Sequence, residues 1–202
     1  MNKKLNRRAL WPTAVALTVT LLTGFPALAK DVQFTAASDI PIVRFSREHA
    51  MMRGVSDAPL VAVFGDGRVV VERPVYMKRP GRHEFALNSA ELSMLLTALA
   101  PVIDLDVDAL RRERDELARS SGQYYMTLDE TVTHIELNFE QFVRDNGRAT
   151  KVARTQSMAD VQIHAETYPT VRGLVSLAGA EAALMGLFER PLAKDTEGAR
   201  DE

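Results

Sequence analysis

Cysteine is absent from this sequence, and tryptophan occurs only once. Without cysteine there is no disulfide, no thiol nucleophile and no cysteine-ligated metal site, so a domain in an oxidising compartment must be held together by packing alone. Hydrophobic residues make up 46% of the 202 residues. A chain of this size buries roughly 70% of the surface that it exposes when unfolded, which is sufficient for a stable core.

An excess of one charge sign is also missing, since 25 Lys and Arg face 27 Asp and Glu. This balance lacks the basic excess typical of nucleic-acid binding, so we expect no nucleic-acid partner. No apolar run reaches the roughly 20 residues that span a bilayer, so we expect no membrane span in the mature chain. Nucleophile-elbow, P-loop and dinucleotide-binding motifs are absent, and the four histidines have no zinc-ligand spacing. We therefore assign no catalytic residue and expect no cofactor and no metal.

The N-terminus has the pattern of a secretory signal. Four basic side chains (Lys3, Lys4, Arg7, Arg8) precede an apolar run over residues 14–22, and Ala27-Leu28-Ala29 provides the small-x-small cleavage motif. We expect cleavage after Ala29 and a periplasmic or secreted bacterial protein, without lipid attachment because no cysteine follows. The paired arginines leave both the general and the twin-arginine export routes open.

The rest of the chain is expected to form a single α+β domain over residues 40–190, after a linker at 30–39 and before a flexible tail at 191–202. Runs of strand-like sequence are followed by helical sequence twice. This order predicts an antiparallel sheet of hairpins or a meander, packed on one face by helices. It leaves open whether the domain consists of two similar ββα-type halves.

The strongest strand signal is a hairpin made of residues 59–64 and 68–72. They are joined by Gly65-Asp66-Gly67, whose residue types tolerate the positive φ of a tight turn. Residues 131–139 alternate between apolar and polar side chains, which predicts a strand covered on one face. Further strands are expected at 40–45, 82–87, 124–128 and 148–154.

Helix signals are equally specific. Asn88 and Glu91 form a capping-box pattern before leucines at 92, 95, 96 and 99, and Pro101 is expected to end this helix. A surface helix over 106–119 is expected to have Asp106 as its N-cap. The spacing of Asp104, Asp106, Asp108 and Asp115 resembles a calcium loop, but Ala109 occupies the position that needs glycine. Two more helices are expected at 159–167 and 171–188, the second buried on two sides, with close backbone approach at Gly179, Ala183 and Gly186.

The most individual surface feature is a stiff basic segment. It contains two prolines, Pro74 and Pro80, and the candidate binding residues Arg73, Tyr76, Lys78, Arg79, Arg82 and His83. Such a loop could bind an acidic partner surface or an anionic envelope polymer, although it could also be a solvated loop. A second candidate surface is His49 with Met51, Met52 and Arg53, where the alternative is core filling. His134 and Glu136 share one strand face and could form a general-base pair.

The run Ala62-Val63-Phe64-Gly65-Asp66-Gly67-Arg68-Val69-Val70, followed by the leucine helix at 89–100, resembles small secreted or periplasmic bacterial proteins of uncharacterised function. Over residues 40–190 the order hairpin, helix, hairpin, helix is also similar to emfourin-type inhibitors of thermolysin-like metalloproteases. This resemblance implies a protein-binding, inhibitor-like function and assigns no site residue.

These observations lead to three hypotheses. The first is a non-enzymatic, exported binding or regulatory domain whose partner is another protein or an acidic envelope component. The second is a carrier that holds a small ligand or lipid between the sheet and the helices. The third is an envelope hydrolase that uses dispersed carboxylates and a histidine, such as His134 with Glu136.

The signal hypothesis makes a direct prediction. Protein recovered from the periplasm or the medium of an expressing bacterium should begin at Lys30, because the motif ends at Ala29. N-terminal sequencing and intact-mass measurement test this. Recovery of an exported chain that retains residues 1–29 would contradict it.

Overall fold

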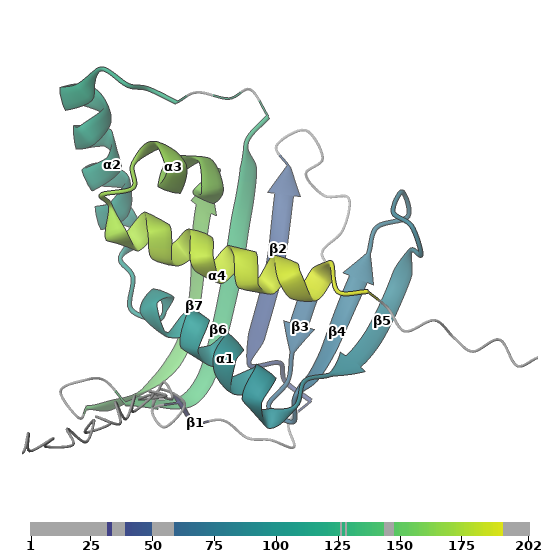
Figure 1. Cartoon of the computed structure of the whole chain (residues 1–202). Coiled ribbons are helices and arrows are strands. Elements are labelled where there is room, and N and C mark those ends of the chain that lie inside the picture. The colour runs from purple at the N-terminus through teal and green to yellow at the C-terminus, as the bar shows by residue number, and fades with distance from the viewer. Residues whose placement is uncertain are drawn as a thin grey trace, which may run out of the picture.

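The computed structural model describes residues 32–33, 39–49, 59–125, 127, 129–143 and 148–191. The predicted signal (1–29), the segment with Met51, Met52 and Arg53, and the tail from 192 lie outside these residues. The strands are β1 (Val32–Gln33), β2 (Val43–His49), β3 (Val61–Val63), β4 (Arg68–Arg73), β5 (Gly81–Ala86), β6 (Thr131–Val143) and β7 (Ala149–Ala159). The helices are α1 (Ser89–Leu99), the 3₁₀ turn η2 (Ala100–Val102), α2 (Val107–Ser121), α3 (Val161–Thr167) and α4 (Arg172–Phe188). Strands followed by helices, twice, confirm the predicted α+β class (Figure 1).

All strand pairs are antiparallel and belong to one sheet. Its order is β5-β4-β3-β2-β6, with β7 pairing β6 along nearly its whole length. A strand has only two edges, so β1 and β2 share the other edge of β6. There β2 pairs with residues 131–137, and β1 pairs with 141–142. The β2–β6 pair therefore joins the first and second parts of the chain at the middle of the sheet.

The helices lie on one face of the sheet (Figure 1). The strand residues on the other face are mostly polar. Along β6, Thr133, Ile135, Leu137 and Phe139 are at most 2% exposed. The residues between them are partly or fully exposed. This alternation confirms the prediction of an antiparallel sheet covered on one face. Among the described residues, no helix is both long and apolar enough to cross a membrane.

The predicted β3–β4 hairpin is present. The backbone N–H of Phe64 donates to the carbonyl of Arg68 at 2.9 Å, and the side chain of Asp66 accepts from the N–H of Arg68 at 2.9 Å. Of the three loop residues only Gly67 has a positive φ, 87°. The turn therefore needs glycine at its last position only, as in hairpins whose loop closes with a left-handed residue.

Helix α1 starts with the predicted capping box. The Asn88 side chain accepts from the N–H groups of Ala90 and Glu91 at 3.0 Å, and Glu91 accepts from the Asn88 N–H at 2.8 Å. The four leucines of the predicted stripe are buried. The α-helix ends at Leu99, just before Pro101, as predicted. Pro101 then lies in the first turn of η2, where a missing N–H is tolerated.

Helix α4 packs against the sheet on one side, and the prediction that it is buried on two sides is wrong. Val175 is 48% exposed and Ala182 is exposed. The expected close approach at Gly179 and Gly186 is also wrong, because nothing lies within 4 Å of an added Cβ there. The tight glycine is Gly173, where a Cβ would clash with the side chain of Leu110 on α2. The buried residues of α4 are Leu174, Leu177, Ala178, Ala180, Glu181, Leu184 and Phe188.

One carboxylate lies within this apolar contact. Glu181 of α4 is 2% exposed, accepts a 2.8 Å hydrogen bond from the Thr133 hydroxyl and lies 3.3 Å from Nε of Arg47. These partners belong to β6 and β2, which pair with each other inside the sheet. A buried charge needs its partners, because removing one of them leaves an uncompensated charge in the core. Glu181 therefore fixes where α4 lies along the sheet.

The strand predicted over 124–128 is wrong at the residues described there. Tyr124, Tyr125 and Thr127 lie outside any strand, in the connection between α2 and β6. The aromatic pair raised the apparent strand propensity, but tyrosine is equally suited to covering a surface with one polar end.

The turn geometry yields a stability prediction. Gly67→Ala should lower the free energy of unfolding by about 2–3 kcal/mol, because the residue has a left-handed φ and its Cβ would lie 2.5 Å from the carbonyl oxygen of Leu87. Gly81→Ala should cost only about 1 kcal/mol, since φ is also positive there but the space is open. Urea unfolding of both variants tests this, and equal losses would contradict it.

Candidate functional site

A pocket of about 430 Å³ lies between α2, α3 and the segment that connects α2 to β6. This volume is within the range of small-molecule sites in proteins. The pocket is lined by Arg114, Asp115, Ala118, Arg119, Tyr124, Tyr125, Thr127, Glu130, Asp160, His164 and Tyr168. It lies beside β7, at the opposite edge of the sheet from β5.

The sequence of α2 explains why one wall is a polar helix. Asp106 is its N-cap, accepting from the N–H of Ala109 at 2.9 Å, which confirms the capping interpretation. Leu110 and Ala118 are buried, while most other side chains are exposed. Arg111 donates to the carbonyl of Ser157 at 2.8 Å and thereby attaches α2 to β7.

The opposite wall is set by Asp160, between β7 and α3. Its φ of 47° turns the chain sharply. Asp160 exchanges hydrogen bonds with Thr131 at the start of β6, through its N–H at 2.8 Å and its carboxylate at 3.0 Å. These bonds hold the first turn of α3 against the sheet, so that His164 faces α2.

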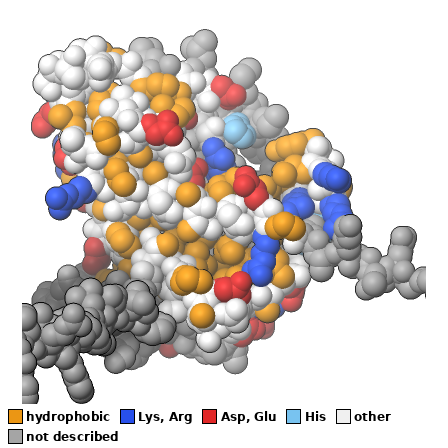
Figure 2. All heavy atoms as spheres, in the orientation of Figure 1, with side chains coloured by type: hydrophobic (Ala, Val, Ile, Leu, Met, Phe, Trp, Pro, Cys, Tyr) orange, Lys and Arg blue, Asp and Glu red, His pale blue; other side chains and the backbone are white. Residues whose placement is uncertain are grey.

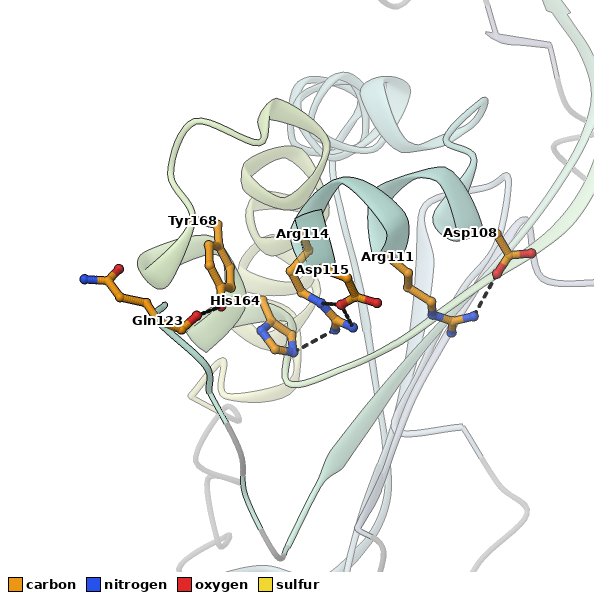
Figure 3. Close-up of polar contacts among 7 residues, drawn as sticks. All are labelled: Asp108, Arg111, Arg114, Asp115, Gln123, His164 and Tyr168. Carbon is orange, nitrogen blue, oxygen red and sulfur yellow. Dashed lines mark hydrogen bonds and ion pairs between the residues drawn. The ribbon is translucent and has the colours of Figure 1, made fainter. Parts of the chain in front are cut away.

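His164 is the central side chain of this site and is only 7% exposed. In Figure 3 it lies between Tyr168 and Arg114, and its Nε2 is 3.1 Å from Nη1 of Arg114. A guanidinium can only donate, so Nε2 must accept and the ring proton must be on Nδ1. Nδ1 is buried and has no hydrogen-bond partner. The Nδ1–H of the imidazole is therefore an unused donor that solvent does not reach.

The surroundings of His164 keep it uncharged. Burial lowers its pKa from the ordinary value, and the positive charge of Arg114 lowers it further. The carboxylates of Asp160, Asp115 and Glu130 act in the opposite direction without cancelling these effects. At neutral pH the imidazole is therefore neutral, in agreement with the hydrogen bond that it accepts.

Aromatic rings fix the orientation of this histidine. Tyr168 stacks on it with ring centres 6.3 Å apart, and Tyr125 meets it edge-on at 5.6 Å. The hydroxyl of Tyr168 donates to the carbonyl of Gln123 at 2.7 Å, which ties α3 to the connection after α2 (Figure 3). Tyr124 is 65% exposed at the rim.

Charges of both signs surround the rings. Arg114 donates from Nε and Nη2 to one oxygen of Asp115, at 2.9 and 2.7 Å, in addition to its contact with His164 (Figure 3). Arg119 and Glu130 are exposed at the rim. Neither sign predominates, and the pocket offers both hydrogen-bond donors and acceptors.

The basic segment predicted as a binding site lies elsewhere, in the connection from β4 to β5. Arg73 has a structural role there, since its Nη2 donates to the carbonyls of Phe188 and Arg190 at 3.2 and 3.0 Å and caps the C-terminus of α4. His83 contacts the carbonyl of Arg79 at 2.9 Å. The side chains of Tyr76, Lys78, Arg79 and Arg82 are exposed.

His134 and Glu136 have separate partners and do not form the general-base pair that their shared face would allow. Glu136 lies 3.6 Å from Arg44, whereas Nδ1 of His134 is 2.8 Å from the Ser157 hydroxyl and its Nε2 is 3.7 Å from Glu48. Both belong to the uncovered face of the sheet. Among the described residues, no group of three or more metal-ligating side chains is close enough to hold a metal ion.

Sequence patterns do not identify the pocket residues as a site, because these residues come from three separate segments. The Tyr124-Tyr125 pair after Gly122 is the available signal, but it fits a strand equally well. No protein-family model matches this chain, and no curated protein or solved structure shows significant similarity to it. The resemblance to emfourin-type inhibitors therefore stays a prediction.

His164 gives a pH-dependent prediction. Because its folded-state pKa is lowered, the unfolded chain binds the proton more readily, and stability is lost as pH falls below about 6.5. Urea unfolding between about pH 7.5 and 5.5 should show a smaller loss for His164→Gln than for the unmodified protein. His83→Gln is the control and should retain the full loss. An unchanged loss in His164→Gln would contradict this assignment.

Proposed function

We propose that this chain is an exported, non-enzymatic binding domain, and that the pocket between α2 and α3 holds a neutral, hydroxyl-rich ligand such as a sugar unit of an envelope glycan. The observation that carries the proposal is the Nδ1–H of His164, which is buried in the pocket wall and has no hydrogen-bond partner in the protein. A buried donor without a partner costs about 1–3 kcal/mol, which a ligand oxygen would recover once a neighbouring side chain of the wall moves aside to expose Nδ1.

The state of His164 favours recognition over catalysis. A general base needs a lone pair within reach of the substrate, but the only lone pair of this neutral ring accepts from Arg114. The remaining Nδ1–H is a hydrogen-bond donor and a very weak acid. The rings of Tyr125 and Tyr168 hold it in one orientation, as a binding site requires.

The composition of the pocket supports a hydroxyl-bearing ligand. Hydroxyl groups both donate and accept, and the rim offers Arg119 as a donor and Glu130 as an acceptor. Opposite charges are nearly balanced, which disfavours a strongly ionic ligand. The aromatic rings supply apolar faces on which the C–H face of a sugar ring can pack. A glycan is also an envelope component, in line with the partner expected from the sequence.

The carrier hypothesis has less support. A lipid between the sheet and the helices would need an apolar cavity there, but that space is filled by side chains. Phe45 and Phe139 of the sheet and Leu174 and Leu177 of α4 are at most 1% exposed. The described pocket is instead polar at its rim and open to solvent. A protein partner, as an inhibitor-like function would require, is an outcome that the following experiment can detect.

The test is a titration of the purified protein, followed by NMR, with oligomers of N-acetylglucosamine and of glucose. We expect shifts at His164 and Tyr125 with one series, and about tenfold weaker binding for Tyr125→Ala, which removes one aromatic wall. Lys151→Ala on the exposed side of β7 is the matched control and should bind normally.

Two results would overturn the proposal. Shifts that avoid the pocket with both series, or equal affinity of Tyr125→Ala and the control, would remove the glycan site. Release of shortened oligomers during the titration would replace binding by hydrolysis.

A further inference from the structure

The connection between β4 and β5, which we call the hairpin tip (residues 74–80), is a structured loop. The N–H of Met77 donates to the carbonyl of Pro74 at 3.0 Å, and Met77 packs against the core. Arg79 has a φ of 58°, and its carbonyl contacts His83 at 2.9 Å. A proline at each end stiffens the loop further. The tip therefore presents its side chains from a fixed frame.

Two apolar side chains at this tip project into solvent. Val75 is 90% exposed and Tyr76 is 72% exposed, more than any other large hydrophobic residue that the structure describes. They are adjacent in sequence, whereas the neighbouring Met77 turns inward. Together they form a small apolar patch that a partner surface could cover.

The charges of the tip itself have one sign, although Glu72 of β4 lies opposite Arg82 in the β4–β5 ladder. Every Lys, Arg, Asp or Glu from residue 73 to 83 is basic, although the whole chain carries a net charge of −2. Because Arg73 is used to cap α4, the exposed cations are Lys78, Arg79 and Arg82, which make no ion pair with any described residue. Figure 2 shows hydrophobic and basic side chains side by side at this end of the β4–β5 hairpin.

We infer that the hairpin tip binds the surface of an anionic phospholipid membrane. In such a contact Val75 enters the boundary of the acyl chains and Tyr76 lies at the level of the headgroups, where tyrosine is favoured. Lys78, Arg79 and Arg82 then lie near the lipid phosphates. The contact is shallow, so it depends on both apolar insertion and charge.

A membrane fits this geometry better than an acidic protein. Charge alone would suit either partner, but Val75 and Tyr76 protrude beyond a stiff loop, and a protein partner would need a matching hollow to receive them. A bilayer interface accepts a small protruding apolar group without prior shape complementarity. Since β5 and β7 are opposite edges of the sheet, the pocket at His164 stays accessible in this arrangement. The inference is therefore independent of the glycan proposal.

The experiment is cosedimentation of the exported, purified protein with vesicles of phosphatidylcholine, with and without phosphatidylglycerol. Binding should require phosphatidylglycerol and weaken with added salt. Lys78→Ala with Arg79→Ala should weaken it by about fivefold per cation. Val75→Ser with Tyr76→Ser should weaken it by about tenfold without changing its salt dependence.

The matched control is Lys151→Ala with Arg154→Ala, which removes two exposed cations from β7 at the other edge of the sheet. It should bind vesicles as the unmodified protein does, and circular dichroism should show all variants folded. The inference is overturned if the two charge variants lose affinity equally, or if vesicles with phosphatidylglycerol are not bound. A different result would assign the tip to a protein partner instead. In that case the protein binds an acidic polypeptide such as polyglutamate but not the vesicles, and Val75→Ser with Tyr76→Ser abolishes this binding.

Discussion

The position of α4 on the sheet determines where the neighbouring helical elements lie. Its leucines stabilise the contact, but apolar burial has no direction and would tolerate a shifted helix. Glu181 does not tolerate such a shift. A displacement of one turn would separate its carboxylate from Arg47 and Thr133 and leave the carboxylate buried without a partner. This contact also positions the C-terminus of α4, which Arg73 caps, and the short helix α3, which packs against α4. The pocket thus depends on a buried charge that does not line it.

Much of the fold follows from local patterns in the sequence. The Asn88 capping box, the leucine stripe of α1 and the Gly67 turn are decided by residues close together in the chain, so sequence was sufficient to predict them. Errors arose where distant partners decide. The exposure of Val175 depends on which face of α4 meets the sheet, and α4 has apolar residues on more than one face. Propensity also could not distinguish the strand expected at Tyr124 from a loop that covers α3.

The candidate site was less predictable than the fold, for a related reason. Nothing near His164 in the sequence indicates that Arg114 will occupy its lone pair, because the contact joins two helices from different parts of the chain. Conversely, Arg73 belongs to a conspicuous basic segment, yet its guanidinium donates hydrogen bonds to carbonyls at the C-terminus of α4. A local pattern identifies which groups are present. Only packing decides which of them remain available to a partner.

The pairing of β2 with β6 also has a consequence for the order in which the molecule can form. β2 is near the start of the chain, whereas β6 comes after two helices, so the central ladder of the sheet closes a long loop. A polypeptide that emerges N-terminus first, from a ribosome or through a translocation channel, cannot complete this ladder until residue 137 has appeared. The hairpins β3–β4 and β4–β5 can form earlier, but their apolar face then lacks α4, which comes last in the chain. Assembly is therefore a late and largely concerted event, and the nascent chain stays open for most of its passage.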